Sequence, residues 1–425
     1  MAEFEPLQNE ISANTLVVGG GISGMTAAIE TAEVGRNVIL IERKPTIGGR
    51  VLATNQYFPK LCPPSCGIEI NLKRLRVTDK VRVLTLAEIV SVTGQPGRYE
   101  VTIRLNPRYV TDKCTLCGEC EKVCDIERDN DLNYGLDKTK AIYLPHLMAY
   151  PHRYVVDAAH AADERMKKVA QACPHGAIDL EMQPRTITAT VKAIVWATGW
   201  RPYDATKIDN LGFGRIPNVV TSVIMERLAS ESGPTGGRIL RPSDKKEIKS
   251  IGFVQCAGSR DENHLPYCSA VCCLASMKQA TYVRERYPDA DVHMFYIDVR
   301  SPGRYEDFYV ARQADTKMHF HRGKVGKIVE NPATGNVILE AENTMTGQIT
   351  KAELDMAVLA IGMVPNSADQ PPPLDVPIDE FGFLVADGDC GIIGAGSALR
   401  PMDVASSIQD ATGAALKAMT AEARR

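Results

Sequence analysis

The sequence predicts an α/β protein with two Rossmann-like halves and one cysteine-rich insertion. Two strand–helix–strand patterns carry this prediction, the first over residues 15–42 and the second over residues 251–297. The first pattern encloses a glycine-rich loop, which is typical of a dinucleotide-binding βαβ unit. Residues 107–182 differ from both patterns because they are rich in proline and cysteine.

Length and charge exclude several classes of protein. The chain has 425 residues, which corresponds to two or three domains at roughly 150 residues each. Its 49 Lys and Arg residues nearly balance its 52 Asp and Glu residues, so we expect no nucleic-acid partner. No apolar stretch is long enough to span a membrane, and residues 1–14 lack the pattern of a secretory signal. We therefore expect a cytoplasmic protein, in which the 12 cysteines serve metal or redox chemistry rather than disulfides.

Periodicity predicts the remaining elements along the chain. We expect strands at 81–84, 99–105 and 186–197, helices at 155–171, 274–286 and 404–419, a β-meander over 325–355 and a buried strand at 356–361.

The glycine-rich loop is the first candidate site. It follows a strand at 15–19, opens a helix at 23–32, and reads Gly19-Gly20-Gly21-Ile22-Ser23-Gly24. In such a loop Gly19 permits the turn, Gly21 lets the backbone approach a pyrophosphate, and Gly24 lets helix and strand pack closely. Glu42 ends the next strand, where it can accept hydrogen bonds from a ribose. The alternative is a helix entry that only needs glycine.

Three segments indicate which dinucleotide binds. Glu42 and Arg43 precede a Gly48-Gly49-Arg50 turn, Ile194–Gly199 forms a second segment, and Gly391–Ser397 forms a third. Together they resemble the two-dinucleotide-binding-domain flavoproteins, whose fold is that of thioredoxin reductase. The resemblance implies FAD contacts at Gly49, Arg50, Thr198, Gly199, Gly396 and Ser397. Ser397 stands where this family usually has an aspartate that binds the ribityl chain, which puts that contact in doubt.

The second half has no nicotinamide loop. Its first strand runs directly into Cys256-Ala257-Gly258, and no second glycine-rich motif follows. We infer a Rossmann-like shell without a site for NAD(P)H, so that electrons reach or leave the flavin through metal centres.

The insertion contains a ferredoxin signature. Cys114, Cys117, Cys120 and Cys124 have the x2, x2, x3 spacing of a [4Fe-4S] ligand run. In bacterial ferredoxins the fourth cysteine serves another cluster, and Cys173-Pro174 resembles the remote Cys-Pro that completes the first. We expect one cluster held by Cys114, Cys117, Cys120 and Cys173, with Cys124 spare or as a competing ligand. A zinc site and a segment that has lost its metal are the alternatives.

The second half holds another cysteine group, made of Cys256, Cys268, Cys272 and Cys273. Spacing alone leaves open buried structural thiols or a redox dithiol. The motifs around them resemble the A subunits of heterodisulfide reductases; they are Gln255–Asp261, Tyr267–Cys273, Tyr296–Arg300 and Tyr305–Tyr309. The resemblance implies a second [4Fe-4S] cluster, close to FAD.

The compact length is similar to a second family, the A subunits of the quinone-interacting membrane-bound oxidoreductases of sulfate reducers. This resemblance implies partner redox subunits, among them another heterodisulfide reductase-like flavoprotein and a membrane quinone-reactive subunit. It also implies a peripheral association with the membrane through those subunits and a link from the quinone pool to adenylylsulfate reductase. We expect no direct membrane span.

These patterns together predict an oxidoreductase subunit that passes electrons between FAD and one or two [4Fe-4S] clusters. The expected domains are an FAD-binding domain of 1–106, 183–247 and 365–425, a ferredoxin-like insertion of 107–182, and a second Rossmann-like domain of 248–364. No catalytic acid, base or nucleophile is identified. The rival interpretations are a pyridine-nucleotide-dependent disulfide reductase that uses Cys62 and Cys66, whose Pro-rich spacing argues against a helix, and a non-catalytic scaffold subunit. Cys390 is expected to be structural.

Overall fold

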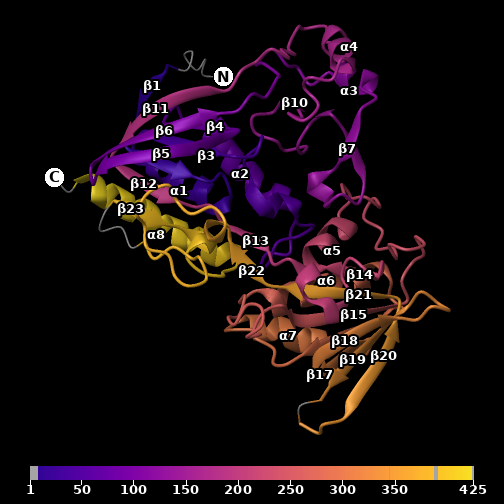
Figure 1. Cartoon of the computed structure of the whole chain (residues 1–425). Coiled ribbons are helices and arrows are strands. Elements are labelled where there is room, and N and C mark those ends of the chain that lie inside the picture. The colour runs from indigo at the N-terminus through magenta and orange to yellow at the C-terminus, as the bar shows by residue number, and fades with distance from the viewer. Residues whose placement is uncertain (1–7, 344, 387–390, 424–425) are drawn as a thin grey trace.

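The computed structural model describes residues 8–343, 345–386 and 391–423, so Cys390 lies outside the described residues. Two lobes lie one above the other in Figure 1, and a smaller insertion lies beside the upper lobe. We call residues 8–105, 185–202 and 363–423 the first lobe, 106–184 the insertion, and 203–362 the second lobe. Both ends of the chain lie at the first lobe (Figure 1).

The first lobe is built on a parallel sheet of five strands. Their order is β23 (Ile392–Gly394), β12 (Ala193–Trp196), β2 (Thr15–Val18), β3 (Val38–Glu42) and β4 (Val81–Thr85). Helices α1 (Ile22–Glu33), α2 (Pro64–Val77) and α8 (Val404–Ala423) share one buried core with this sheet. The other face packs in a second core against a mixed sheet of β1 (Glu10–Ser12), β11 (Arg185–Val191), β6 (Arg98–Leu105) and β5 (Ala87–Gln95).

The predicted strand at 186–197 is two strands. β11 pairs antiparallel with β6, from Arg185 opposite Leu105 to Val191 opposite Tyr99. After Lys192 the chain enters the parallel sheet as β12. The break occurs because each half of the segment pairs in a different sheet.

The second lobe repeats the layered arrangement. Its parallel sheet has the order β14 (Val219–Thr221), β21 (Met356–Ile361), β15 (Ser250–Ala257), β16 (Asp291–Tyr296) and β17 (Met318–Arg322). Helices α5 (Ser222–Ala229), α6 (Cys272–Arg286) and α7 (Tyr305–Gln313) lie beside it, together with a meander of β18 (Lys324–Glu330), β19 (Val337–Glu342) and β20 (Ile349–Leu354). Because β14 pairs with β21, the strand pairing starts this lobe before residue 248, earlier than the sequence predicted.

Two short strands join the lobes. β13 (Trp200–Pro202) carries the chain into the second lobe and β22 (Met363–Pro365) carries it back, and they pair antiparallel. Figure 1 shows both crossings at the narrow point between the lobes.

Helix α5 adds a buried polar contact between the lobes. The Glu226 carboxylate accepts from the backbone N–H of Asn55 in the first lobe at 3.0 Å, and it forms a 2.8 Å ion pair with Lys278 of α6. The neighbouring Arg227 is 1% exposed and donates to Asn133 Oδ1 of the insertion at 2.8 Å. One helix therefore contacts all three parts of the chain through charged side chains.

The insertion is small and has its own core. Its elements are α3 (Glu119–Val123), β7 (Glu127–Asp129), β8 (Lys138–Lys140), β9 (Ile142–Tyr143), β10 (Val155–Val156) and α4 (Arg165–Gln171). The predicted helix at 155–171 is therefore wrong in its first part. Val155 and Val156 pair with β9, and the Asp163 carboxylate accepts from the Arg165 N–H, which caps α4 at its start. Among the described residues, no helix is long and apolar enough to cross a membrane.

Candidate functional site

The glycine-rich loop lies where β2 meets α1, and its glycines have different tasks. Gly19 has φ +105°, a conformation that other residues rarely adopt. A Cβ atom at residue 24 would overlap the carbonyl oxygen of Gly19, so Gly24 permits close packing of helix and strand. At residue 21 a Cβ atom would meet only Gly49 Cα, at 3.9 Å. Gly21 therefore borders open space at the start of α1.

The start of α1 is suited to an anion. Gly21 is the N-cap residue and offers no side chain, so no side chain caps the first-turn N–H groups. Glu42 lies beside the loop, where its carboxylate accepts from the N–H groups of Gly20 and Lys44, each at 2.8 Å. Each carboxylate oxygen keeps a lone pair for a further donor, as a ribose hydroxyl would supply.

The other two predicted flavin segments come to the same place. A Cβ atom at Gly19 would come 3.2 Å from Thr198 Cα, and the Thr198 hydroxyl is buried without a partner among the described residues. Gly396 has φ +65°, and a Cβ atom there would overlap Ser23. Ser397 is 7% exposed and follows directly. Segments almost 380 residues apart thus meet around one loop.

Two residues that the sequence analysis missed hold these segments. Asn366 donates from Nδ2 to the Thr198 carbonyl at 2.6 Å, and its N–H donates to the Gly199 carbonyl at 3.1 Å. Asp410 of α8 accepts from the Gly396 N–H at 2.7 Å. Neither residue belongs to a local motif, so no sequence signal marked them.

The two predicted arginines have protein partners. Arg43 donates to the side chain of Gln370. The Arg50 guanidinium lies 4.5 Å from the centre of the Trp200 ring and donates to the Tyr134 hydroxyl of the insertion at 2.8 Å. The turn at Gly49 and Arg50 therefore connects the loop with the insertion. Gly49 itself packs on the loop, since a Cβ atom there would lie 2.7 Å from Gly21 Cα.

In the insertion, four thiols surround one cavity. Its lining includes Cys114, Cys117, Cys120 and Cys173, together with apolar side chains such as Val110 and Ile142. Burial raises the pKa of Cys120 to about 11, and the three other thiols add to the shift. Such thiols ionise readily only when a positive centre stabilises them, as in metal ligation.

Cys124 lies apart from this cavity. It is 3% exposed, and its thiol donates to the Ile126 carbonyl at 3.7 Å. Of the two alternatives for the fourth position, the structure brings Cys173 and not Cys124 to the other three thiols.

The second cysteine group lies where β15 ends and α6 begins. Cys256 has φ +57° beside a β-bulge, and Cys272 and Cys273 form the first turn of α6. Burial raises the pKa of Cys272 and Cys273, and the other cysteines of the group, Cys256 and Cys268 among them, raise it further. The four thiols are therefore close neighbours, at the end of the helix where a nicotinamide loop would lie.

The donor sets of both groups suit an iron–sulfur cluster, which cysteine thiolates ligate. Among the described residues, no group of three or more His, Cys, Asp or Glu side chains is arranged to hold a metal ion. In the insertion the thiols instead surround a cavity with a largely apolar wall.

Cys62 and Cys66 correct one expectation. Helix α2 begins at Pro64, because proline fits the first helical position, and Cys66 therefore lies in its first turn. A hydrogen bond with Cys62 raises the pKa of Cys66, so the two thiols are adjacent. The proline-rich spacing does not prevent a helix here.

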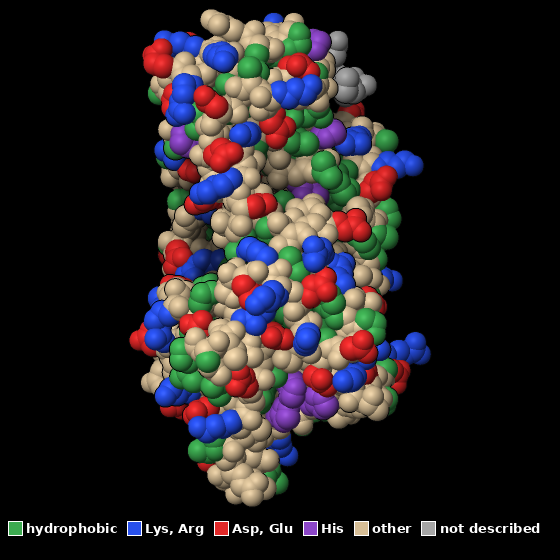
Figure 2. All heavy atoms as spheres, turned by 90° about the vertical axis from the view of Figure 1, so that its right-hand side faces the viewer, with side chains coloured by type: hydrophobic (Ala, Val, Ile, Leu, Met, Phe, Trp, Pro, Cys, Tyr) green, Lys and Arg blue, Asp and Glu red, His purple; other side chains and the backbone are tan. Residues whose placement is uncertain are grey.

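A histidine group lies outside these sites. Histidine side chains gather on the surface of the second lobe (Figure 2). His293 of β16 contacts His321 of β17, with Nδ1 and Nε2 2.9 Å apart, and His319 contacts Asp291 at 2.9 Å. The sequence showed no such group, because parallel pairing of the two strands brings the residues together.

Fold and loop geometry first define the class of the protein, an FAD-dependent oxidoreductase with the fold of the thioredoxin reductases. Residues 14–70 match the family model described as FAD dependent oxidoreductase. Thioredoxin reductase of T. acidophilum is similar with a TM-score of 0.52 and 14% identity, over 96% of this chain and 98% of that chain. Bacillithiol disulfide reductase of Bacillus cereus has a TM-score of 0.52 and 15% identity, over 97% and 100%.

Within that class, the chain belongs to the family of heterodisulfide reductase A subunits. It is 38% identical to the iron-sulfur A subunit numbered 2 of CoB–CoM heterodisulfide reductase from Methanopyrus kandleri, over 99% of this chain and 66% of the relative. It is 34% identical to the A subunit of H(2):CoB-CoM heterodisulfide,ferredoxin reductase from Methanothermobacter marburgensis, over 98% and 65%. The chain thus spans about two thirds of the length of the curated relatives it matches.

Proposed function

We propose that the chain is the electron-transfer subunit of a multi-subunit redox complex, in which electrons pass between FAD and two [4Fe-4S] clusters. The observation that carries this proposal is the cavity lined by Cys114, Cys117, Cys120 and Cys173 in the insertion. Bound FAD exchanges electrons in pairs, whereas each cluster carries one at a time. A chain that holds both kinds of group can connect two-electron and one-electron partners.

The residues of the chain have distinct parts in this proposal. Gly21 and the first turn of α1 bind the FAD pyrophosphate, and Glu42 orients the ribose. Asn366 and Asp410 hold the two remote segments against the flavin site. The largely apolar wall around the insertion's thiols excludes water from the cluster there.

The finer proposal concerns partners. Similarity to the A subunits of quinone-interacting membrane-bound oxidoreductases supports a complex that links a membrane quinone pool to adenylylsulfate reductase in sulfate reduction. In it the chain is cytoplasmic, is held at the membrane by partner subunits, and contacts another flavoprotein subunit and a quinone-reactive subunit. Members of the family named as parts of ferredoxin-dependent reductases support redox partners in general.

An anaerobic count of flavin, iron and sulfide per chain tests the core of this proposal. We expect stoichiometric FAD and about eight irons, four for each cluster. Replacing Cys114 and Cys117 by serine should remove about half of the iron, and replacing Cys268 and Cys272 should remove the other half. Iron near four that is insensitive to the second pair would leave Cys256 to Cys273 as packed thiols.

The adjacent thiols of Cys62 and Cys66 favour a second candidate function, a pyridine-nucleotide-dependent disulfide reductase. In that case NADH or NADPH would bleach the flavin of the isolated subunit within seconds. Our proposal expects no bleaching, because Cys256 and Cys272 occupy the strand end and helix start that would bind the nucleotide. A Cys62→Ser variant with unchanged cluster reduction would also contradict the reductase. A flavin that no donor reduces would instead indicate a scaffold subunit.

A further inference from the structure

Gln255 is buried without a hydrogen-bonding partner. It lies in β15 directly before Cys256, beside the β-bulge that ends the regular pairing with β21. The residue is 3% exposed. Both its amide nitrogen and its amide oxygen are buried and lack a partner among the described residues.

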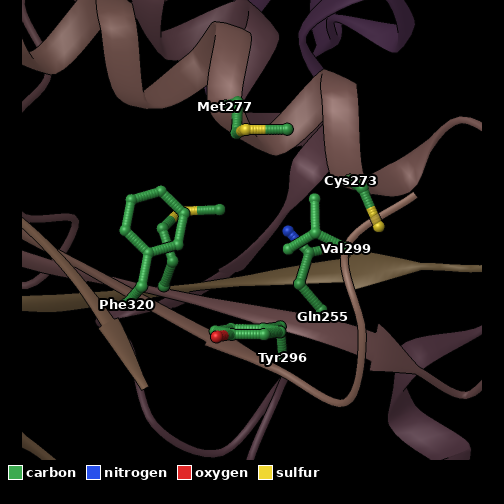
Figure 3. Close-up of a pocket in the computed structure, with 7 residues that line it drawn as sticks. Gln255, Cys273, Met277, Tyr296, Val299 and Phe320 are labelled. Carbon is green, nitrogen blue, oxygen red and sulfur yellow. The ribbon is translucent and has the colours of Figure 1, made fainter. Parts of the chain in front are cut away.

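The side chain extends into a small cavity between the sheet and α6 (Figure 3). Four apolar side chains line it: Met277, Met294, Val299 and Phe320. Tyr296 presents its ring to the cavity, and its hydroxyl points away from Gln255 (Figure 3). The remaining lining residue is Cys273.

The cavity is too small for an organic ligand. The space between these side chains takes about one water molecule, which excludes a nicotinamide or quinone ring. The Cys273 thiol is therefore the polar group of the lining that lies on the side of a candidate metal centre.

An amide in this position is unfavourable on its own. A buried donor without a partner loses its hydrogen bonds to water and gains nothing in return. Leucine or methionine would fill the same space among Met277, Met294 and Phe320 without that cost. The amide therefore requires a partner that the side chains of the cavity do not supply.

The position of Gln255 suggests that partner. It precedes one cysteine of the group, Cys256, and shares a cavity with another, Cys273. Sulfur atoms of iron–sulfur clusters accept hydrogen bonds, and such bonds raise the reduction potential because they stabilise the more negative, reduced state.

We propose that the Gln255 amide donates a hydrogen bond to a sulfur atom of the cluster ligated by Cys273, and thereby raises the reduction potential of that cluster. The inference rests on the proposed function, since it needs a cluster at Cys256, Cys268, Cys272 and Cys273. Gln255 is then a positioning and tuning residue and not a ligand.

An EPR-monitored redox titration of the whole subunit with Gln255→Leu tests the inference. At a fixed poise we expect the ratio of reduced to oxidised cluster to fall about tenfold, which is ~59 mV for a one-electron couple. The signal of the insertion's cluster and the flavin should keep their potentials. Met277→Leu, which alters the same cavity without removing a donor, is the matched control and should leave all potentials unchanged.

Two further measurements keep the test decisive. If Gln255→Leu fails to assemble, Gln255→Met offers a longer apolar replacement with the same expected shift. In ¹⁵N-labelled wild-type protein, pulsed EPR of the reduced cluster should detect a nitrogen coupling that Gln255→Met lacks. An unchanged potential together with an unchanged nitrogen coupling overturns the inference alone, whereas a wild-type protein without a second cluster signal overturns the proposed function as well.

Discussion

Gly24 packs so closely against Gly19 that a Cβ atom on residue 24 would overlap the carbonyl oxygen of Gly19. Gly21, three residues earlier, has no such neighbour, because the nearest atom to its Cβ position is Gly49 Cα at 3.9 Å. The two glycines therefore separate folding from cofactor binding within one loop.

The first prediction compares replacements at these glycines. Gly21→Val should fold but purify without flavin, because its side chain projects toward the pyrophosphate and not into the protein. Gly24→Ala should lower the thermal midpoint of unfolding or prevent folding, because the chain must move to admit the methyl group. Absorbance at 450 nm and circular dichroism check both outcomes. A yellow Gly21→Val protein would refute the assigned pyrophosphate site.

A second prediction uses two cysteines of the insertion. Cys173→Ser should lose about half of the iron, because residue 173 lines the cavity with three other thiols. Cys124→Ser is the matched control and should keep all of it, because the Cys124 thiol donates to the Ile126 carbonyl outside the cavity. Iron analysis of anaerobically purified variants decides, and the reverse result would make Cys124 the ligand.

The third prediction concerns the buried ion pair between the lobes. In the Glu226–Lys278 pair the two side chains are 7% and 5% exposed. Glu226→Gln leaves the Lys278 ammonium without its counter-charge and should cost about 3–5 kcal/mol of folding free energy. The double replacement Glu226→Gln with Lys278→Met should be less destabilised, because no buried charge remains. Urea unfolding measures both, and a single variant within about 0.5 kcal/mol of wild type would show an unimportant pair.

The fourth prediction is a pH dependence at the histidine group. Burial lowers the pKa of His293 from 6.5 to about 4, and His321 and His319 lower it further, while Asp291 opposes them. The unfolded chain therefore binds a proton that the folded chain refuses between these values. The contribution to stability is fully present above pH 6.5 and is lost as the pH falls toward 4.

His293→Phe tests this dependence, because phenylalanine keeps a stacked ring but does not titrate. Its thermal midpoint should fall less between pH 6.5 and 4 than that of the wild type. Lys317 and Asp291 also lie in this group, joined at 3.3 Å, and both remain in the variant. Identical slopes for the two proteins would assign the pH dependence to other groups.

The sequence predicted those parts of the fold that depend on local pattern. The glycine-rich loop, the first strands of both halves and the two cysteine groups follow from spacing within a few residues. The break at Lys192 and the early start of the second lobe at β14 do not, because they depend on which distant strand each segment pairs with.

The same limit applies to the candidate site. Asn366 and Asp410 act from segments far from the glycine loop, so no motif included them. The Pro-rich spacing before Cys66 was interpreted against a helix, although proline is favourable at a first helical position. Gln255 was noticed only as part of a motif, and its missing partners became visible when the packing around it was known.

The strand pairing around the insertion has a consequence for how such a protein could arise. The insertion leaves the first lobe after Leu105 and returns at Arg185, and these two residues are opposite each other in one antiparallel pair. A short hairpin between them would restore an uninterrupted sheet with the same strand order. The ferredoxin-like segment can therefore be regarded as a cassette that entered an ancestral flavoprotein gene at a single loop, so the flavin-binding lobe and the relay can be inherited, exchanged or lost separately.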